Sequence, residues 1–349
     1  MNAYFRDSIL QTKAYTLKKY RHKIKLNQNE FPLDLSPALK KKVLAALKKL
    51  PLNRYPEYEP FALKNKLAKR LKIAPEQLLI TNGSNVLVQA LVAACAFRGK
   101  VMVVEPTFSV YEIEAKLFEN QVIKVPLSKC DFSLDETEFL SKLEAEKPNL
   151  VFLANPNAPT GNPFTQEFLF KVLQSAPGLV VIDEAYAEFS GETLLPWVKQ
   201  YPNLVILRTF SKACGLGGVR VGYLVAQESI TSQVVKVLMP YCLSGISACI
   251  AEIALDYPGL VKQNIREITQ ERKRVFAAMQ QIPSVKVFPS QTNFLLFKVN
   301  DAPGTFAKLV KKGILIREIS SDTLSHCLRV SIGTKQENDQ FIKILKQAI

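Results

Sequence analysis

The segment LVILRTFSKACGLGGVR (residues 204–220) decides how the rest of the chain is interpreted. It opens with an apolar run that is typical of a buried strand, and small and polar residues follow. Lys212 lies there among hydroxyls and glycines, and Arg220 comes shortly before a second apolar run. Burial in such a loop disfavours the ammonium form of a lysine, and a neutral amine attacks carbonyl compounds. Lys212 is therefore a candidate nucleophile, although a lone lysine in a turn is more often a surface charge.

Two upstream segments show the same arrangement of an apolar strand followed by polar residues. The segment LVVIDEAY (179–186) contains Asp183 and Tyr186, and VFLANPNAPTG (151–161) passes into a turn that holds Asn157. Open α/β sheets bind their ligands at the carboxyl ends of the strands. Successive strands that each end in polar side chains therefore predict one ligand site at the edge of a mostly parallel sheet.

Size and composition limit the possible classes of protein. The 349 residues suffice for a large core with a smaller domain, and 48% hydrophobic with 22% charged residues is ordinary for a globular chain. No apolar run approaches the ~20 residues that cross a bilayer, and residues 1–30 lack the pattern of a secretion signal. We therefore expect a cytoplasmic protein with no membrane partner.

Cysteine and histidine usage gives little support to metal chemistry. The six cysteines are scattered without CxxC spacing and only two histidines are present, so we expect no metal site. The net charge of +15 suits nucleic acid, anionic small molecules or a solvated surface. Lysines lie off the apolar stripe of residues 36–50, where Ser36 is an expected helix N-cap. This pattern favours a solvated basic face and predicts no nucleic-acid partner.

Two further turns are candidate ligand contacts. A short strand runs into Gly83-Ser84-Asn85, and the free N–H groups of the helix expected there would suit a phosphate. Another strand, at 100–105, ends in a Pro-Thr-Phe turn, where Phe108 is either a core residue or an aromatic face for a ligand. Similar turns cap many helices, so neither signal is specific by itself.

The last part of the chain carries two arginines in strand-like segments. Arg317 ends the apolar run 314–317, and Arg329 lies inside the run 327–332. A buried guanidinium requires an anion or a fixed acid, and its planar fork fits a carboxylate through two parallel hydrogen bonds. An internal salt bridge and a substrate carboxylate both satisfy that requirement for Arg329.

The patterns along the chain predict three parts. Residues 1–30 form a polar arm that is expected to pack with the small domain or with a dimer partner. Strand and helix patterns alternate along much of residues 31–261, which is typical of a large parallel-sheet domain. From residue 262 a charged helix, a strand pair, a helix, two strands and a last helix predict a smaller α+β domain at 262–349.

The order Asn157, Asp183, Tyr186, Lys212, Arg220 resembles that of the fold-type I aminotransferases, over nearly the whole chain. The resemblance implies an α/β fold: a large domain on a mostly parallel seven-stranded sheet, plus the small α+β domain. It also implies the cofactor pyridoxal 5′-phosphate, for which the protein supplies attachment, orientation and electrostatics.

Other segments are similar to the histidinol-phosphate aminotransferases in particular. They are KLNQNEFP (25–32), Arg54-Tyr55-Pro56, the stretch 240–244 and the arginine pair. Two departures stand out. Residues 33–36 replace a usual Tyr-Gly-x-Ser run, and Ala158 stands where the family has an asparagine before Pro-Thr-Gly.

The resemblance implies a role for each candidate residue. Lys212 would bind the cofactor covalently and act as the base, Asp183 would hold the pyridine nitrogen, and Tyr186 the phenolic oxygen. The other implied cofactor contacts are Gly83, Ser84, Asn85, Phe108, Asn157 (in place of the missing asparagine), Ser211, Arg220 and, across the interface of a homodimer, Tyr55. The implied substrate contacts are Tyr15, Asn29, Arg317 and Arg329.

The implied reaction is transamination between L-histidinol phosphate and 2-oxoglutarate in histidine biosynthesis, with small-molecule partners. Three alternatives stay open at this point. A related enzyme type decarboxylates a phosphorylated amino acid such as threonine phosphate, and another transaminates aromatic amino acids. The third is a cofactor-binding regulatory protein that uses its basic surface on DNA, for which no reader module is visible.

Overall fold

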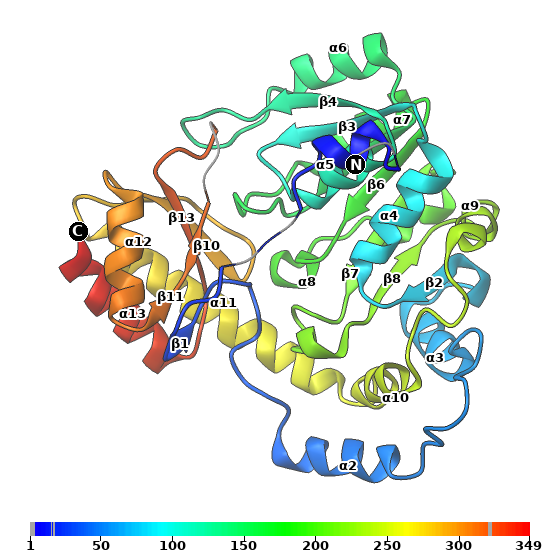
Figure 1. Ribbon diagram of the computed structural model, residues 1–349, viewed down its shortest axis with the longest axis horizontal. Coiled ribbons are helices and arrows are strands. Elements are labelled where there is room, and N and C mark those ends of the chain that lie inside the picture. Colours follow the sequence, from blue (N-terminus) through cyan, green and yellow to red (C-terminus); the bar gives the residue numbers. More distant parts are fainter. Residues whose placement is uncertain (1–3, 15, 17, 320–322) are drawn as a thin grey trace.

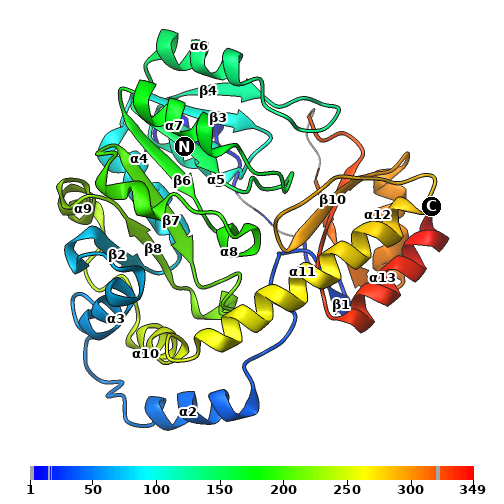
Figure 2. The ribbon, with the colours of Figure 1, turned by 180° about the vertical axis from the view of Figure 1, so that it is seen from behind.

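The computed structural model describes residues 4–14, 16, 18–319 and 323–349. In this part of the chain a large layered α/β unit adjoins a smaller unit, and the long helix α11 (Pro258–Gln280) runs from one to the other (Figure 1, Figure 2). None of the helices in the described ranges combines the length and apolar content needed to cross a membrane.

The large unit is built on one sheet, which confirms the mostly parallel arrangement inferred from the sequence. Strand β8 runs antiparallel to both of its neighbours, and the remaining neighbouring pairs are parallel. In spatial order the seven strands found among the described residues are β2 (Leu78–Thr81), β8 (Gly222–Val225), β7 (Leu204–Thr209), β6 (Leu179–Asp183), β5 (Leu150–Ala154), β3 (Lys100–Glu105) and β4 (Gln121–Pro126).

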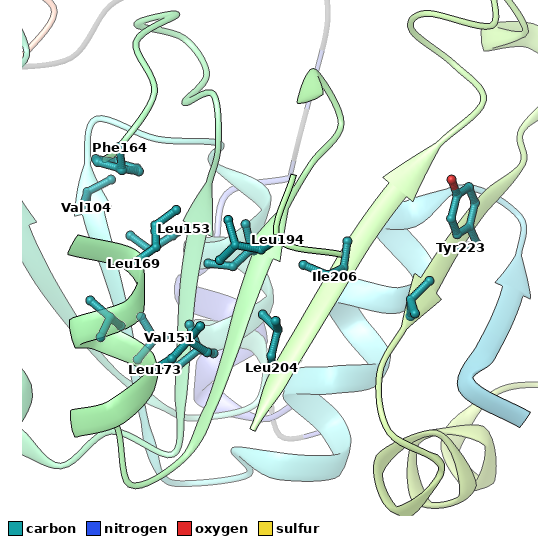
Figure 3. Close-up of a cluster of buried hydrophobic side chains, with 14 of the residues drawn as sticks. Val104, Val151, Leu153, Phe164, Leu169, Leu173, Leu194, Leu204, Ile206 and Tyr223 are labelled. Atoms are coloured by element: carbon teal, nitrogen blue, oxygen red, sulfur yellow. The ribbon is translucent and has the colours of Figure 1, made fainter. Parts of the chain in front are cut away.

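The central strands are apolar up to their carboxyl ends because helices cover both faces of the sheet. Alternate residues of β5, β6 and β7 point to opposite faces, so Leu153 and Ile206 join one core (Figure 3), whereas Phe152 and Val205 join the other. The Figure 3 core includes side chains of α7, and the opposite core includes those of α4. Both cores hold the strand ends rigidly in register.

Four helices of the large unit begin at a side chain that caps the first turn. Ser36 accepts a hydrogen bond from the backbone N–H of Leu39 at 3.3 Å, as expected for the N-cap of α2. The helices of this unit are α2 (Pro37–Leu47), α3 (Phe61–Leu71), α4 (Ser84–Cys95), α5 (Val110–Leu117), α6 (Glu136–Glu146), α7 (Gln166–Ser175), α8 (Ala187–Ser190), α9 (Glu228–Val234) and α10 (Gly245–Ala254).

The small unit packs short strands against helices around a third core. Its antiparallel sheet has the order β12 (Arg317–Glu318), β13 (Cys327–Ser331), β10 (Phe294–Lys298), β9 (Lys286–Val287). Helices α11, α12 (Ala302–Lys311) and α13 (Lys335–Ala348) supply the apolar side chains of this core, which include Ile268, Phe306 and Phe341. The sequence pattern predicted two strands between the last two helices, whereas β11 (Ile314–Leu315) and β12 are separate short strands ahead of β13.

The N-terminal segment contacts both units. Strand β1 (Ile24–Lys25) pairs in parallel with β11 of the small unit. The short helix α1 (Asp7–Gln11) lies instead against α5 of the large unit, where Arg6 contacts Glu119 at 3.2 Å (Figure 1). The arm therefore bridges the two units within one chain, which the sequence analysis did not anticipate.

Candidate active site

A cavity of about 510 Å³ lies where the carboxyl edge of the large sheet meets the small unit. Asp183 at the end of β6, Thr209 at the end of β7 and Lys212 just after it line this cavity. Arg317 and Arg329 line it from the small unit. The strand ends that the sequence marked as one ligand site are thus brought together.

One end of the cavity has the features of an anion cradle. Ser84 and Asn85 begin α4, and Arg220 donates a hydrogen bond to Oγ of Ser211 at 3.2 Å. Gly83 has φ +84°, a backbone conformation that favours glycine, and a Cβ there would lie 2.6 Å from Nη2 of Arg220 and would force that side chain to shift. Hydroxyls, a guanidinium and a helix N-terminus converge here, which is the donor set that a phosphate requires.

Asp183 is buried and held at both oxygens. Its Oδ2 accepts a hydrogen bond from the hydroxyl of Tyr111 at 2.7 Å, and its Oδ1 accepts one from the backbone N–H of Ala185 at 3.0 Å. Burial raises the pKa of the Asp183 carboxyl, and these hydrogen bonds act in the opposite direction. A buried carboxylate in this position favours a cationic partner, such as a protonated ring nitrogen.

Lys212 is directed towards the N-terminal segment. Its amine donates hydrogen bonds to the backbone carbonyls of Gln28 at 3.1 Å and Asn29 at 3.2 Å, and it lies 5.6 Å from the centre of the Tyr186 ring. The amide of Asn29 in turn donates to the hydroxyl of Tyr186 at 2.9 Å. Asn29 therefore adjoins both predicted catalytic side chains.

Two arginines on strands of the small unit lie side by side. Arg317 of β12 pairs directly with Arg329 of β13 in an antiparallel register, which places both side chains on one face. Arg329 also donates to the carbonyl of Asn27 at 3.1 Å and lies over the Phe294 ring. Two guanidinium groups facing one cavity make its wall cationic and suited to an anionic substrate group.

Asn157 lies behind the cavity, in a different place from the one that the resemblance implied. Its side chain is completely buried and donates to the carbonyl of Pro106 at 2.9 Å and to Oγ1 of Thr160 at 2.8 Å. Its Oδ1 accepts from the hydroxyl of Thr107 at 2.7 Å. The neighbouring Ala158 lines the cavity instead, so the amide is engaged in holding the turn together.

One other predicted residue is not brought to the cavity within this chain. Tyr55 is 84% exposed and stacks on Tyr241, with 5.1 Å between ring centres. Its contact with the cofactor across an interface stays a prediction. Tyr15 lies outside the described residues.

The sequence analysis missed several residues that the fold brings here. Tyr111 follows Phe108 by one helical turn, a spacing that could have indicated a shared face. Lys124 lines the cavity and contacts Glu105 at 2.8 Å and Glu112 at 3.0 Å, and it had no sequence signal. Across the described ranges, no group of three or more His, Cys, Asp or Glu side chains is placed to hold a metal ion.

The residues present fit pyridoxal phosphate. The cradle at Ser84 and Arg220 suits a phosphate, Asp183 suits a protonated ring nitrogen, and the amine of Lys212 suits an aldehyde. Gly222 supports the same fit, because a Cβ there would collide with the backbone nitrogen of Ser84 and close the cradle. Phe108, whose ring lines the cavity, supplies an aromatic face.

The sheet, the cradle and the lysine together define a fold-type I enzyme of the pyridoxal-phosphate class. The chain belongs to the aminotransferase class I and II family, whose model matches residues 21–345.

Similar proteins agree with this assignment. The histidinol-phosphate aminotransferase of Pyrococcus furiosus is 39% identical over 342 residues, covering 98% of this chain and 97% of the relative. Histidinol-phosphate aminotransferase 2 of Nitrosococcus oceani is 37% identical, with 98% and 96% covered.

Solved structures share the fold at lower identity. The histidinol-phosphate aminotransferase of Sinorhizobium meliloti, solved in complex with pyridoxal-5′-phosphate, has a TM-score of 0.89 at 24% identity, covering 100% of this chain and 98% of that chain. The L-threonine-O-3-phosphate decarboxylase of Porphyromonas gingivalis has a TM-score of 0.81 at 23% identity, with 93% and 98% covered. These likenesses show that the fold is shared, and they do not identify the substrate of this chain.

Proposed function

We propose that this enzyme transfers an amino group between L-histidinol phosphate and 2-oxoglutarate, forming imidazole-acetol phosphate and glutamate in histidine biosynthesis. The observation that carries the proposal is the pair Arg317 and Arg329 on the wall of the cavity that also contains Lys212. The cradle at Arg220 would hold the cofactor phosphate, so a phosphorylated substrate needs a second anion site, and the arginine pair supplies one.

Pyridoxal phosphate, when bound, serves as the electron sink that makes the proton on the substrate Cα acidic. Lys212 is the residue placed to accept that proton at Nζ and to return it, because it follows the end of β7 at the cavity wall. Asp183 would hold a proton on the ring nitrogen of the cofactor through its charge. Tyr186, whose hydroxyl is held by Asn29 at 2.9 Å, would donate a hydrogen bond to the phenolic oxygen of the cofactor.

The two substrates place different demands on the arginines. Histidinol phosphate carries a phosphate but no α-carboxylate, whereas glutamate and 2-oxoglutarate carry two carboxylates. We assign Arg317 chiefly to the phosphate and Arg329 chiefly to the α-carboxylate, in each case through the planar guanidinium fork. Tyr15 belongs to the same proposal as a second phosphate contact.

The proposal includes a homodimer. Exposed apolar side chains gather in residues 52–61 and 239–246, where Leu52 is 78% and Met239 77% exposed. Apolar surface of this kind is typical of a protein interface. Tyr55 lies within it, so in the dimer its hydroxyl would reach the cofactor phosphate of the other chain. Sedimentation equilibrium on the purified chain tests this part, and a monomer would contradict it.

Two further expectations are part of the proposal. The division into an arm at 1–30, a large domain at 31–261 and a small domain at 262–349 is supported by the separate sheets of the two units. A cytoplasmic location is supported by six free cysteines, which suit a reducing compartment.

The test is a visible absorption spectrum of the enzyme loaded with pyridoxal phosphate, recorded before and after addition of histidinol phosphate. We expect the visible band to disappear and to return when 2-oxoglutarate is added. The same experiment with O-phosphothreonine and with phenylalanine separates the rivals. Release of carbon dioxide from O-phosphothreonine, or bleaching by phenylalanine alone, would contradict the proposed donor.

A further inference from the structure

Tyr111 is a buried residue whose hydroxyl meets the key carboxylate of the site. It lies in the first turn of α5, is 0% exposed and donates to Oδ2 of Asp183 at 2.7 Å. A phenol has one proton to donate, and an ionised carboxylate only accepts, so the direction of this hydrogen bond is defined by the charge on Asp183.

The ring of Tyr111 is held in place on two sides. It stacks on Phe152 of β5 at 4.7 Å between centres and meets Phe108 edge-on at 5.5 Å. Its backbone N–H also donates to the carbonyl of Phe108 at 3.2 Å. The residue that supplies the aromatic face for the cofactor and the residue that contacts Asp183 therefore belong to one packed turn.

We infer that Tyr111 is a positioning residue that keeps Asp183 ionised and aims its free lone pairs at the pyridine nitrogen of the cofactor. Oδ1 is already occupied by the N–H of Ala185, at 3.0 Å, so the two hydrogen bonds orient the carboxylate plane. A hydrogen bond to the charged form of an acid favours ionisation, against the effect of burial.

The charged and titratable groups around Asp183 act on its pKa in opposite directions. Burial raises the pKa of Asp183, Glu184 raises it further, and Tyr111 and Lys212 lower it. Burial, together with Asp183, raises the pKa of Tyr111 well above its usual value, so the phenol keeps its proton throughout the working pH range. Without this donor, the proton shared between Asp183 and the pyridine nitrogen would move towards the carboxylate.

The inference rests on the cofactor chemistry of the proposed function but not on the identity of the amino donor. Its test compares Tyr111→Phe with Tyr223→Phe, each of which removes one buried hydroxyl. Tyr223 is 5% exposed, lies on β8 beside Phe210 and does not line the cavity. The readouts are the ¹⁵N chemical shift of labelled pyridoxal phosphate in the loaded enzyme and its dissociation constant.

For Tyr111→Phe we expect the ¹⁵N shift to move towards that of an unprotonated pyridine and the dissociation constant to rise about tenfold, equivalent to about one pKa unit. Tyr223→Phe should change neither readout. Equal shifts and equal affinities for the two variants would overturn the inference. Failure of the unchanged enzyme to bind pyridoxal phosphate would instead contradict the proposed function.

Replacement of Tyr111 by 3-fluorotyrosine keeps the test decisive if the phenylalanine variant does not fold. The fluorinated phenol is a stronger donor of nearly the same size, so the ¹⁵N shift should move the opposite way, towards a protonated pyridine. A purely structural tyrosine would give no such change of sign, and an unchanged shift would contradict the inference.

Discussion

The two walls of the cavity are built in different ways. On the large-unit wall, Asp183 and Lys212 follow adjacent parallel strands, so residues that are close in space succeed one another along the chain. On the opposite wall, Asn29 meets Ser331, 302 residues away, with Oδ1 accepting from the serine hydroxyl at 3.1 Å. The cofactor half of the site thus depends on strand order, and the substrate half depends on how distant segments dock.

The largest effect is expected on the large-unit wall, for Lys212→Ala. The variant loses both the amine that attaches the cofactor and the base at Cα, so turnover should fall by at least about 10⁴-fold. Borohydride reduction followed by mass spectrometry checks the attachment. Lys124→Ala is the control, because Lys124 lines the same cavity within an ion-pair cluster and its loss should leave the attachment intact. Covalent cofactor on the Lys212→Ala variant would contradict the assignment.

A mutation behind the large-unit wall is expected to lower the stability of the fold. Glu184 follows Asp183 but pairs with Arg208 at 2.7 Å, and the two side chains are only 1% and 12% exposed. Glu184→Gln leaves a buried guanidinium without its charge partner and should lower the free energy of unfolding by about 3–5 kcal/mol.

Urea denaturation measures this loss against a surface control. Glu167→Gln removes the acid of an exposed pair with Lys171, where the acid is 79% exposed, and should change the stability much less than Glu184→Gln does. If both variants lost the same stability, the buried pair would not be what supports the wall.

A mutation in the substrate wall is expected to weaken substrate binding and to leave the cofactor chemistry unchanged. Arg317→Ala removes a charged hydrogen-bond donor, so the KM for histidinol phosphate should rise between ten- and about 100-fold, with less change for 2-oxoglutarate. Steady-state kinetics with each substrate check this. An unchanged KM for histidinol phosphate would exclude Arg317 as the phosphate contact, and Arg317→Lys shows whether charge alone restores binding.

The smallest effect is expected for Asn157→Ala, behind the large-unit wall. One hydrogen bond within the turn and two to Pro106 and Thr107 are lost, so stability should fall by about 1–3 kcal/mol. The absorption band of the bound cofactor should stay where it is. A shift of the absorption band would instead indicate that Asn157 contacts the phenolic oxygen of the cofactor, as the resemblance first implied.

Local patterns were sufficient for the large unit. The apolar runs of β5, β6 and β7, each followed by polar residues, predicted the parallel sheet and the shared position of Asp183 and Lys212 at its edge. Parallel strands align their carboxyl ends whatever the details of packing, which is why sequence order alone predicted this half of the site.

Other features of the site were decided by tertiary structure. Strands β11 and β12 have two residues each, too few for a periodic pattern, so the facing of Arg317 and Arg329 follows from register and was not visible in the sequence. The same holds for the Tyr111–Asp183 hydrogen bond and for the buried place of Asn157. By itself the sequence determined the fold class and the residues at the strand ends. Only the docking of the small unit and the N-terminal segment decided what faces them, because those contacts join residues that no local pattern relates.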